Sequence, residues 1–155
     1  MSRNHLFTRR AALQLAGVAG ISAVAWPHFT LAQDAELPEL VFTGNEYAFK
    51  LAGEPAAGWT RIKFDNQGMM DHHLMLMKLH DPGTVADFES VLETPDFGAI
   101  FPLAASIGGP GAGPGLSSTV VLDLQPGEYF AICVIPEEDG TPHYMLGMKL
   151  HFTVA

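Results

Sequence analysis

Residues 133–155 read CVIPEEDGTPHYMLGMKLHFTVA and contain the only cysteine of the chain. Cys133 ends an apolar run, and the chain then passes through an acidic segment before it reaches His143 and Met148. The spacing is Cys-x9-His-x4-Met. A thiol, an imidazole and a thioether therefore lie close together in the sequence, on a segment that the pattern predicts to be one loop between two strands.

The strand that leads into this loop is predicted from the run Tyr129-Phe130-Ala131-Ile132-Cys133. Successive side chains of a strand point to opposite faces of the sheet. Tyr129, Ala131 and Cys133 should therefore share one face. Phe130 and Ile132 should share the other, and the thiol should lie at the end of the strand.

Short runs rich in β-forming residues occur along the chain and are separated by glycine and proline: 40–43, 46–52, 59–64, 73–79, 117–124, 128–135 and 148–154. About seven strands of this kind predict an all-β sandwich. Alternation is clear in 46–52, whereas Trp59, Ile62 and Phe64 would share a face only if a bulge interrupts their strand. The runs predict the strands and leave the register of 59–64 open.

The longest connection lies between the fourth and fifth predicted strands. Residues 84–93, TVADFESVLE, place Val85, Phe88 and Leu92 at helical spacing, which predicts one short helix. Residues 107–115, IGGPGAGPG, are so rich in glycine and proline that they predict a surface loop without regular structure.

The N-terminal segment predicts export. Thr8-Arg9-Arg10 precedes the uncharged stretch AALQLAGVAGISAVAW, which is typical of a twin-arginine signal. Small residues at Thr30-Leu31-Ala32 predict cleavage after Ala32, so that 1–32 is the signal and 33–155 the mature domain, without membrane insertion. The alternative is an uncleaved anchor. Both interpretations place the folded domain in the periplasm or otherwise outside the cytoplasm.

The mature domain is strongly acidic. The formal charge of the full chain is −9, and it falls to −12 for 33–155 because residues 1–32 hold three arginines and no acid. Nucleic acid is therefore excluded as a partner, since its binding depends on cationic side chains, whereas a basic protein would be attracted. A lone cysteine cannot form an internal disulfide, so Cys133 should be buried, reactive or a metal ligand.

The donors of the C-terminal segment suit a soft, redox-active metal. Thiolate and thioether select copper, and two histidines with one cysteine and a weak axial methionine describe a blue-copper site. One imidazole is missing from the C-terminal segment. The stretch Asn66-Gln67-Gly68-Met69-Met70-Asp71-His72-His73 offers two candidates at the start of an apolar strand.

These motifs resemble those of the cupredoxins, the family of plastocyanin, azurin and rusticyanin. The resemblance covers 40–155 and lies in the N-x-G-x-x-x-H pattern that ends at His72, in PGEYFAIC and in HYMLGM. It implies a Greek-key β-sandwich that holds one type 1 copper ion. By the resemblance, His72, Cys133 and His143 would be the strong ligands, and Met148 the weak axial ligand.

Two features depart from the family pattern. The interval from Cys133 to His143 is longer than in the small electron carriers and closer to that of copper nitrite reductases. The histidine doublet also offers a second candidate, His73; the resemblance favours His72, and the alternation of the following strand is less decisive. His80 and His151 have no partners at ligand spacing, and His151 is expected at the surface.

The resemblance implies an exported, monomeric, single-domain electron carrier. The edge of His143 would serve as the electron port, within an apolar patch formed by Pro142, Tyr144 and Met145. An acidic rim would then steer a basic redox partner such as a cytochrome; it consists of Glu137, Glu138 and Asp139.

The sequence bears on three other functions. The sequence has no nucleophile elbow, no HExxH helix and no phosphate-binding loop, so we expect the protein not to be an enzyme. A copper-binding or copper-delivery protein could use the same ligands or the thioethers of Met69 and Met70. A cupredoxin-like interaction module that binds no metal is the remaining alternative.

Overall fold

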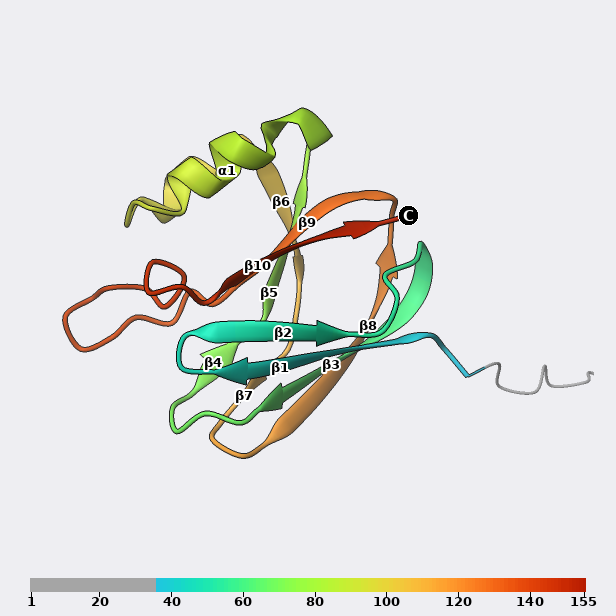
Figure 1. Ribbon diagram of the computed structural model, residues 1–155, viewed down its shortest axis with the longest axis horizontal. Helices are drawn as coiled ribbons and strands as arrows, with labels where there is room; N and C mark the ends of the chain where they lie inside the picture. Colours follow the sequence, from blue (N-terminus) through green and yellow to red (C-terminus); the bar gives the residue numbers. More distant parts are fainter. Residues whose placement is uncertain (1–35) are drawn as a thin grey trace, which may run out of the picture. The chain divides into compact units, whose positions relative to one another are not determined.

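The computed structural model describes residues 36–155, so the predicted signal at 1–32 lies outside the described residues. Two four-stranded sheets form a sandwich (Figure 1). The first sheet has the order β2-β1-β3-β8, from Ala48–Ala52, Glu39–Asn45, Gly58–Asn66 and Ser117–Leu124. The second has the order β10-β9-β5-β6, from Lys149–Val154, Gly127–Ile132, Met75–Leu79 and Ala104–Gly108. The predicted all-β sandwich is confirmed.

The core between the two sheets is built from alternating residues. In β3, Thr60, Ile62, Phe64 and Asn66 are buried, while Trp59 is 62% exposed. The strand therefore alternates regularly and needs no bulge. Trp59 therefore does not share a face with Ile62 and Phe64, because the residues that face the core begin one position after Trp59.

From Tyr129 onward strand β9 is buried on both faces, which explains the unbroken apolar sequence of this part. Tyr129, Ala131 and Cys133 belong to the core between the sheets. Phe130 and Ile132 face the opposite way, into a second apolar cluster that includes residues of the helix α1, Val85–Val91. The predicted division of this run between two faces is confirmed, and the thiol lies one residue beyond the end of β9.

The predicted helix at 84–93 is present as α1, preceded by a single 3-10 turn at Pro82–Thr84 and followed by another at Phe97–Ile100. Phe88 anchors the helix, because its ring lies 4.7 Å from that of Phe130 between ring centroids. No helix within 36–155 is both long and apolar enough to span a membrane.

The prediction of an irregular loop at 107–115 was wrong in part. Strand β6 runs to Gly108, and the short strand β7, Gly111–Ala112, pairs with β4, His72–His73. Between them, Pro110 accepts a hydrogen bond from the backbone N–H of Leu74 at 2.9 Å. The glycine-rich segment is thus hydrogen-bonded to the histidine doublet and to Leu74, and these bonds hold the backbone of the doublet in place.

Gly109 should tolerate no side chain, because a Cβ there would collide with the carbonyl oxygen of Leu74. Gly108 is a matched control: it also has a positive φ, but a Cβ there would meet nothing within 4 Å. We expect Gly108→Ala to lower the free energy of unfolding by about 1–2 kcal/mol through backbone strain. Gly109→Ala should cost about 2 kcal/mol more through the collision. Urea unfolding measures both, and equal losses would contradict the close approach.

The two ends of the sandwich are formed by different segments of the chain. The turn between β1 and β2, the strand β4 and the loop between β9 and β10 gather at one end (Figure 1). The C-terminal Ala155 lies at the other end, where its carbonyl accepts a hydrogen bond from Ala57. The predicted ligands His72, Cys133 and His143 belong to the first end.

Candidate metal centre

Three buried donors converge at this end of the sandwich. His72 comes from β4, Cys133 follows β9, and His143 lies in the loop that leads to β10. Their ligand atoms all lie within 4.8 Å of one another. The Nδ1 atoms of His72 and His143 are 3.2 Å apart, and Cys133 Sγ lies 3.5 Å from His143 Nδ1. Two imidazole nitrogens and a sulfur therefore face one point.

Backbone hydrogen bonds fold the loop after β9 back onto the cysteine. Tyr144 N–H donates to the Cys133 carbonyl at 2.9 Å, and Cys133 N–H donates to the Met148 carbonyl at 3.1 Å. Met148 N–H in turn donates to the His143 carbonyl at 3.0 Å. These bonds fold the segment that carries the cysteine, the histidine and the methionine into a compact turn, so that residues ten and more positions apart lie close together.

Met148 is fully buried, and its side chain lies against β1. A Cβ added to Gly44 would come within 3.2 Å of the Met148 Cε and 2.7 Å of the Phe64 ring. A glycine at this position thus leaves the space that the thioether needs. The structure brings the three predicted strong donors together, and the backbone of Met148 is hydrogen-bonded to two of these residues. The assignment of all four residues as ligands stays a prediction.

The two histidines of the doublet have different roles. The His72 residue is 1% exposed and turns its Nδ1 toward His143. His73 is half-buried, and its backbone N–H donates to Cys133 Sγ at 3.3 Å. His72 therefore offers its ring to the donor cluster, whereas His73 offers a main-chain group that any residue would supply.

The loop before His72 is shaped by Asn66. Its side-chain amide donates to the carbonyls of Met70 at 2.7 Å and Ala112 at 2.8 Å, and its oxygen accepts from Gly68 N–H at 2.9 Å. A Cβ on Gly68 would lie 2.9 Å from His72 Nε2. The asparagine and glycine of the N-x-G motif are thus explained: one holds the loop, and the other leaves room for the histidine.

Burial controls the protonation of these donors. It lowers the pKa of His72 below its ordinary value, with a further contribution from His143. Burial raises the pKa of the Cys133 thiol, while the hydrogen bond from the N–H of His73 lowers it in part. At neutral pH His72 is therefore neutral and Cys133 is a thiol. A metal ion that binds here must displace the thiol proton, as thiolate coordination requires.

The outward edge of the site differs from the prediction of an exposed histidine in an apolar patch. His143 is 1% exposed, and Pro142 and Tyr144 are buried. The hydroxyl of Tyr144 donates to the carbonyl of Thr94 at 3.0 Å. Pro142 and Tyr144 therefore form no exposed apolar patch around His143, because both are buried and Tyr144 packs in the second apolar cluster.

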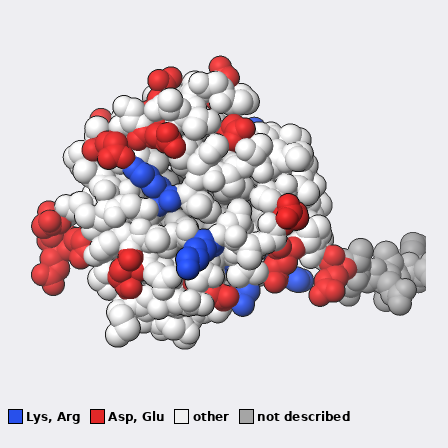
Figure 2. Space-filling view, in the orientation of Figure 1, with Lys and Arg blue, Asp and Glu red and all other residues white. Residues whose placement is uncertain are grey.

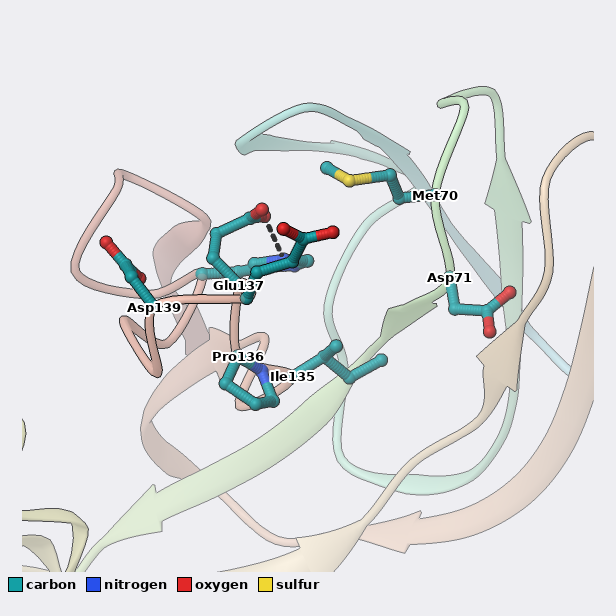
Figure 3. Close-up of a pocket in the computed structure, with 8 residues that line it drawn as sticks. Met70, Asp71, Ile135, Pro136, Glu137 and Asp139 are labelled. Carbon is teal, nitrogen blue, oxygen red and sulfur yellow. Dashed lines mark hydrogen bonds and ion pairs between the residues drawn. The ribbon is translucent and has the colours of Figure 1, made fainter.

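An acidic cavity of about 510 Å³ lies over His143 instead. Figure 3 shows it between the loop that carries Met70 and Asp71 and the loop that carries Glu137 and Asp139. Glu137 Oε1 lies 2.8 Å from the Nε2 of His143. The predicted acidic rim is thus present, and one of its members contacts the histidine directly.

Sequence reasoning missed Glu46 and Tyr47, in the turn between β1 and β2. The Tyr47 hydroxyl donates to Glu137 Oε1 at 2.8 Å, a bond that raises the pKa of the tyrosine. Glu46 Oε1 lies 3.6 Å from His72 Nε2. Both residues fall in the strand predicted at 46–52, whereas β2 begins at Ala48, and no pattern in the sequence indicates these contacts.

The remaining candidate histidines lie elsewhere. His80 Nε2 contacts the carbonyl of Phe101 at 3.3 Å, and the exposed His151 pairs with Glu128 at 2.7 Å. Met77 is fully buried in the second apolar cluster, and Met75 packs against it. Among the methionines of 69–77, Met69 is the exposed one, at 84%.

Comparison with solved structures identifies the fold. Auracyanin B is 24% identical and matches with a TM-score of 0.50 over 77% of this chain and 91% of its own. Dithionite-reduced auracyanin from the photosynthetic bacterium Roseiflexus castenholzii is 22% identical and matches with a TM-score of 0.51 over 76% and 97%. Neither the protein-family models nor the curated protein sequences give a match.

The chain therefore has the cupredoxin fold, and the predicted fold class is confirmed. Within that fold, the converging sulfur and two Nδ1 atoms fit one type 1 copper ion. A thiolate, two imidazoles and a nearby thioether are the donor set of such an ion, and all four residues are buried.

Proposed function

We propose that this protein is a blue-copper electron carrier that holds one copper ion through His72, Cys133 and His143, with Met148 as a weak fourth ligand. The observation that carries the proposal is the convergence of Sγ and two Nδ1 atoms within 4.8 Å at the end of a cupredoxin fold. Bound copper would supply a one-electron Cu(II)/Cu(I) couple. The hydrogen-bonded loop would keep the donors in one arrangement in both states.

A carrier is proposed rather than an enzyme because the donors are buried. His72, Cys133 and Met148 are enclosed by the two sheets and their loops, and His143 is covered by Glu137. Four protein donors around one ion leave no position for a substrate. The proposal also includes export by the twin-arginine signal at 1–32.

A basic redox protein, such as a cytochrome, is the proposed partner. Four carboxylates line the cavity over His143: Asp71, Glu137, Glu138 and Asp139. Figure 2 shows acidic side chains at the left edge, over the loop that follows β9 in Figure 1. Such a charged concave surface would speed the encounter with a cationic partner, more so at low salt.

Copper titration of the metal-free protein tests the proposal. We expect Cu(II) to produce an intense visible band from charge transfer out of the Cys133 thiolate, at one ion per chain. Colourless binding of Cu(I) without this band would favour copper delivery. The absence of copper binding would leave an interaction module.

Copper delivery has one specific observation in its favour. Met69 is 84% exposed at the end of the sandwich that holds the donor cluster, and Met70 lines the cavity there. Thioethers bind Cu(I). If delivery is the function, Met69→Leu should slow the transfer of Cu(I) to an acceptor without changing the visible spectrum of the Cu(II) protein.

Replacing Met148 with leucine should keep the blue colour and raise the reduction potential. Leucine fills a similar volume, so the buried site stays packed, while loss of a weak sulfur donor disfavours Cu(II). Voltammetry of both proteins measures the difference. An unchanged potential would make Met148 a core residue and remove it from the ligand set.

A further inference from the structure

The two histidines of the donor cluster share an arrangement at their outward sides. Their Nδ1 atoms face each other, so each Nε2 points away from the centre. Glu137 Oε1 lies 2.8 Å from the Nε2 of His143, and Glu46 Oε1 lies 3.6 Å from that of His72. Each imidazole therefore has a carboxylate at its far nitrogen, in direct contact at His143 and at longer range at His72.

Both carboxylates are held in place by other groups. Glu137 accepts a hydrogen bond from the Tyr47 hydroxyl at 2.8 Å, and its own N–H donates to the carbonyl of Thr141 at 2.9 Å. Glu46 accepts hydrogen bonds from the backbone N–H groups of Met69 and Met70. Neither side chain depends on a histidine for its position.

A single turn serves both carboxylates. Glu46 and Tyr47 are adjacent in the turn between β1 and β2, and one faces His72 while the other orients Glu137 against His143. Two consecutive residues of this turn thus act at the Nε2 atoms of both histidines. The turn therefore couples the positions of both rings to β1, a strand with neighbours on each side in its sheet.

We propose that Glu137, oriented by Tyr47, is a positioning residue that fixes the ring of His143 and favours the oxidised state of bound copper, with Glu46 acting more weakly on His72. The inference rests on the proposed function. A carboxylate that accepts the far N–H of an imidazole orients the ring and strengthens it as a donor. Its negative charge also stabilises Cu(II) more than Cu(I).

Glu137 also replaces the expected exposed edge of His143. Because the carboxylate lies directly on Nε2 at the floor of the cavity, a partner meets the acidic side chain before it meets the ring. The residue that sets the balance between the two copper states is therefore also the residue that a cationic partner would approach.

The test compares Glu137→Gln with Glu138→Gln, since Glu138 lines the same cavity and the two variants lose the same charge. We expect Glu137→Gln to lower the preference for Cu(II) over Cu(I) at least tenfold, which raises the potential by about 59 mV or more. Glu138→Gln should change that preference less than threefold. Tyr47→Phe, which keeps the carboxylate and loses its orienting bond, should fall between them.

A second measurement needs no redox chemistry. In the Zn(II)-loaded protein, we expect the Nε2 proton of His143 to exchange slowly with solvent and to give an NMR signal. Glu137→Gln should retain the signal because its amide oxygen still accepts the hydrogen bond. Glu137→Ala should lose it. Equally fast exchange in the wild type and the alanine variant would overturn the positioning role.

The failures of the two proposals are distinguishable. A wild-type protein that does not turn blue with copper contradicts the proposed function, and the Zn(II) exchange measurement still tests the contact of Glu137 with His143. A blue wild-type protein whose Glu137→Gln and Glu138→Gln variants have the same potential overturns the inference and leaves the proposed function standing.

Discussion

Cys133→Ser protein is expected to fold and to stay colourless when Cu(II) is added. The intense visible band needs a thiolate, which serine cannot supply, whereas the sandwich is formed by strands that do not depend on the thiol. Cys133 is fully buried and accepts a hydrogen bond from His73 N–H, which a serine oxygen could also accept. The loss of colour should therefore be complete, while the variant still folds.

Absorption spectroscopy of the copper-treated variant and urea unfolding of its metal-free form measure the two effects separately. We expect the free energy of unfolding to fall by about 1–3 kcal/mol, the cost of a poorly paired buried hydroxyl. Cys133→Ala is the control for that cost, since it has no polar group to bury and should be equally colourless. A blue serine variant would show that the ligand assignment is wrong.

The histidine doublet allows an equally large effect to be assigned to one residue. His72→Ala should abolish the type 1 spectrum, or leave a copper site that added imidazole restores, because the ring that meets His143 at 3.2 Å is lost. His73→Ala should keep the spectrum nearly intact. Its contribution is a backbone N–H to Cys133 Sγ, and alanine supplies the same group.

Spectra of both variants with and without imidazole decide the assignment. If the variants exchange these behaviours, His73 is the ligand and β4 must adopt a different register in the metal-bound protein. If both remain blue, the second imidazole must come from His80 or His151. Those rings contact the Phe101 carbonyl and Glu128 respectively, so they would have to leave their partners.

Most of the strands could be predicted because their apolar faces are recorded in the local sequence, whereas β6, Ala104–Gly108, was not among the predicted runs. The residues of β9 divide between two clusters as the alternation predicts. The register of β3 could not be predicted, since a large apolar residue, Trp59, stands on the exposed face and imitates a core position. The pairing of β7 with β4 is hidden for a different reason: strands of two residues carry no periodic pattern.

The candidate site was predictable where its residues are neighbours in the sequence. Cys133, His143 and Met148 belong to one hydrogen-bonded turn, so their spacing is visible in the sequence as a motif. The carboxylates were not predictable. Tyr47 meets Glu137 across 90 positions of sequence, and this contact exists only after β1 and β2 have packed against the loop after β9.

The position of Ala155 determines how the protein could be attached to a surface. The C-terminal carbonyl is bonded to Ala57 at the end of the sandwich opposite the donor cluster. A short linker added after Ala155 and anchored to an electrode would therefore hold the acidic cavity toward the solution. Such a film would keep the cavity open to dissolved cationic partners, while the body of the sandwich separates the donor cluster from the electrode.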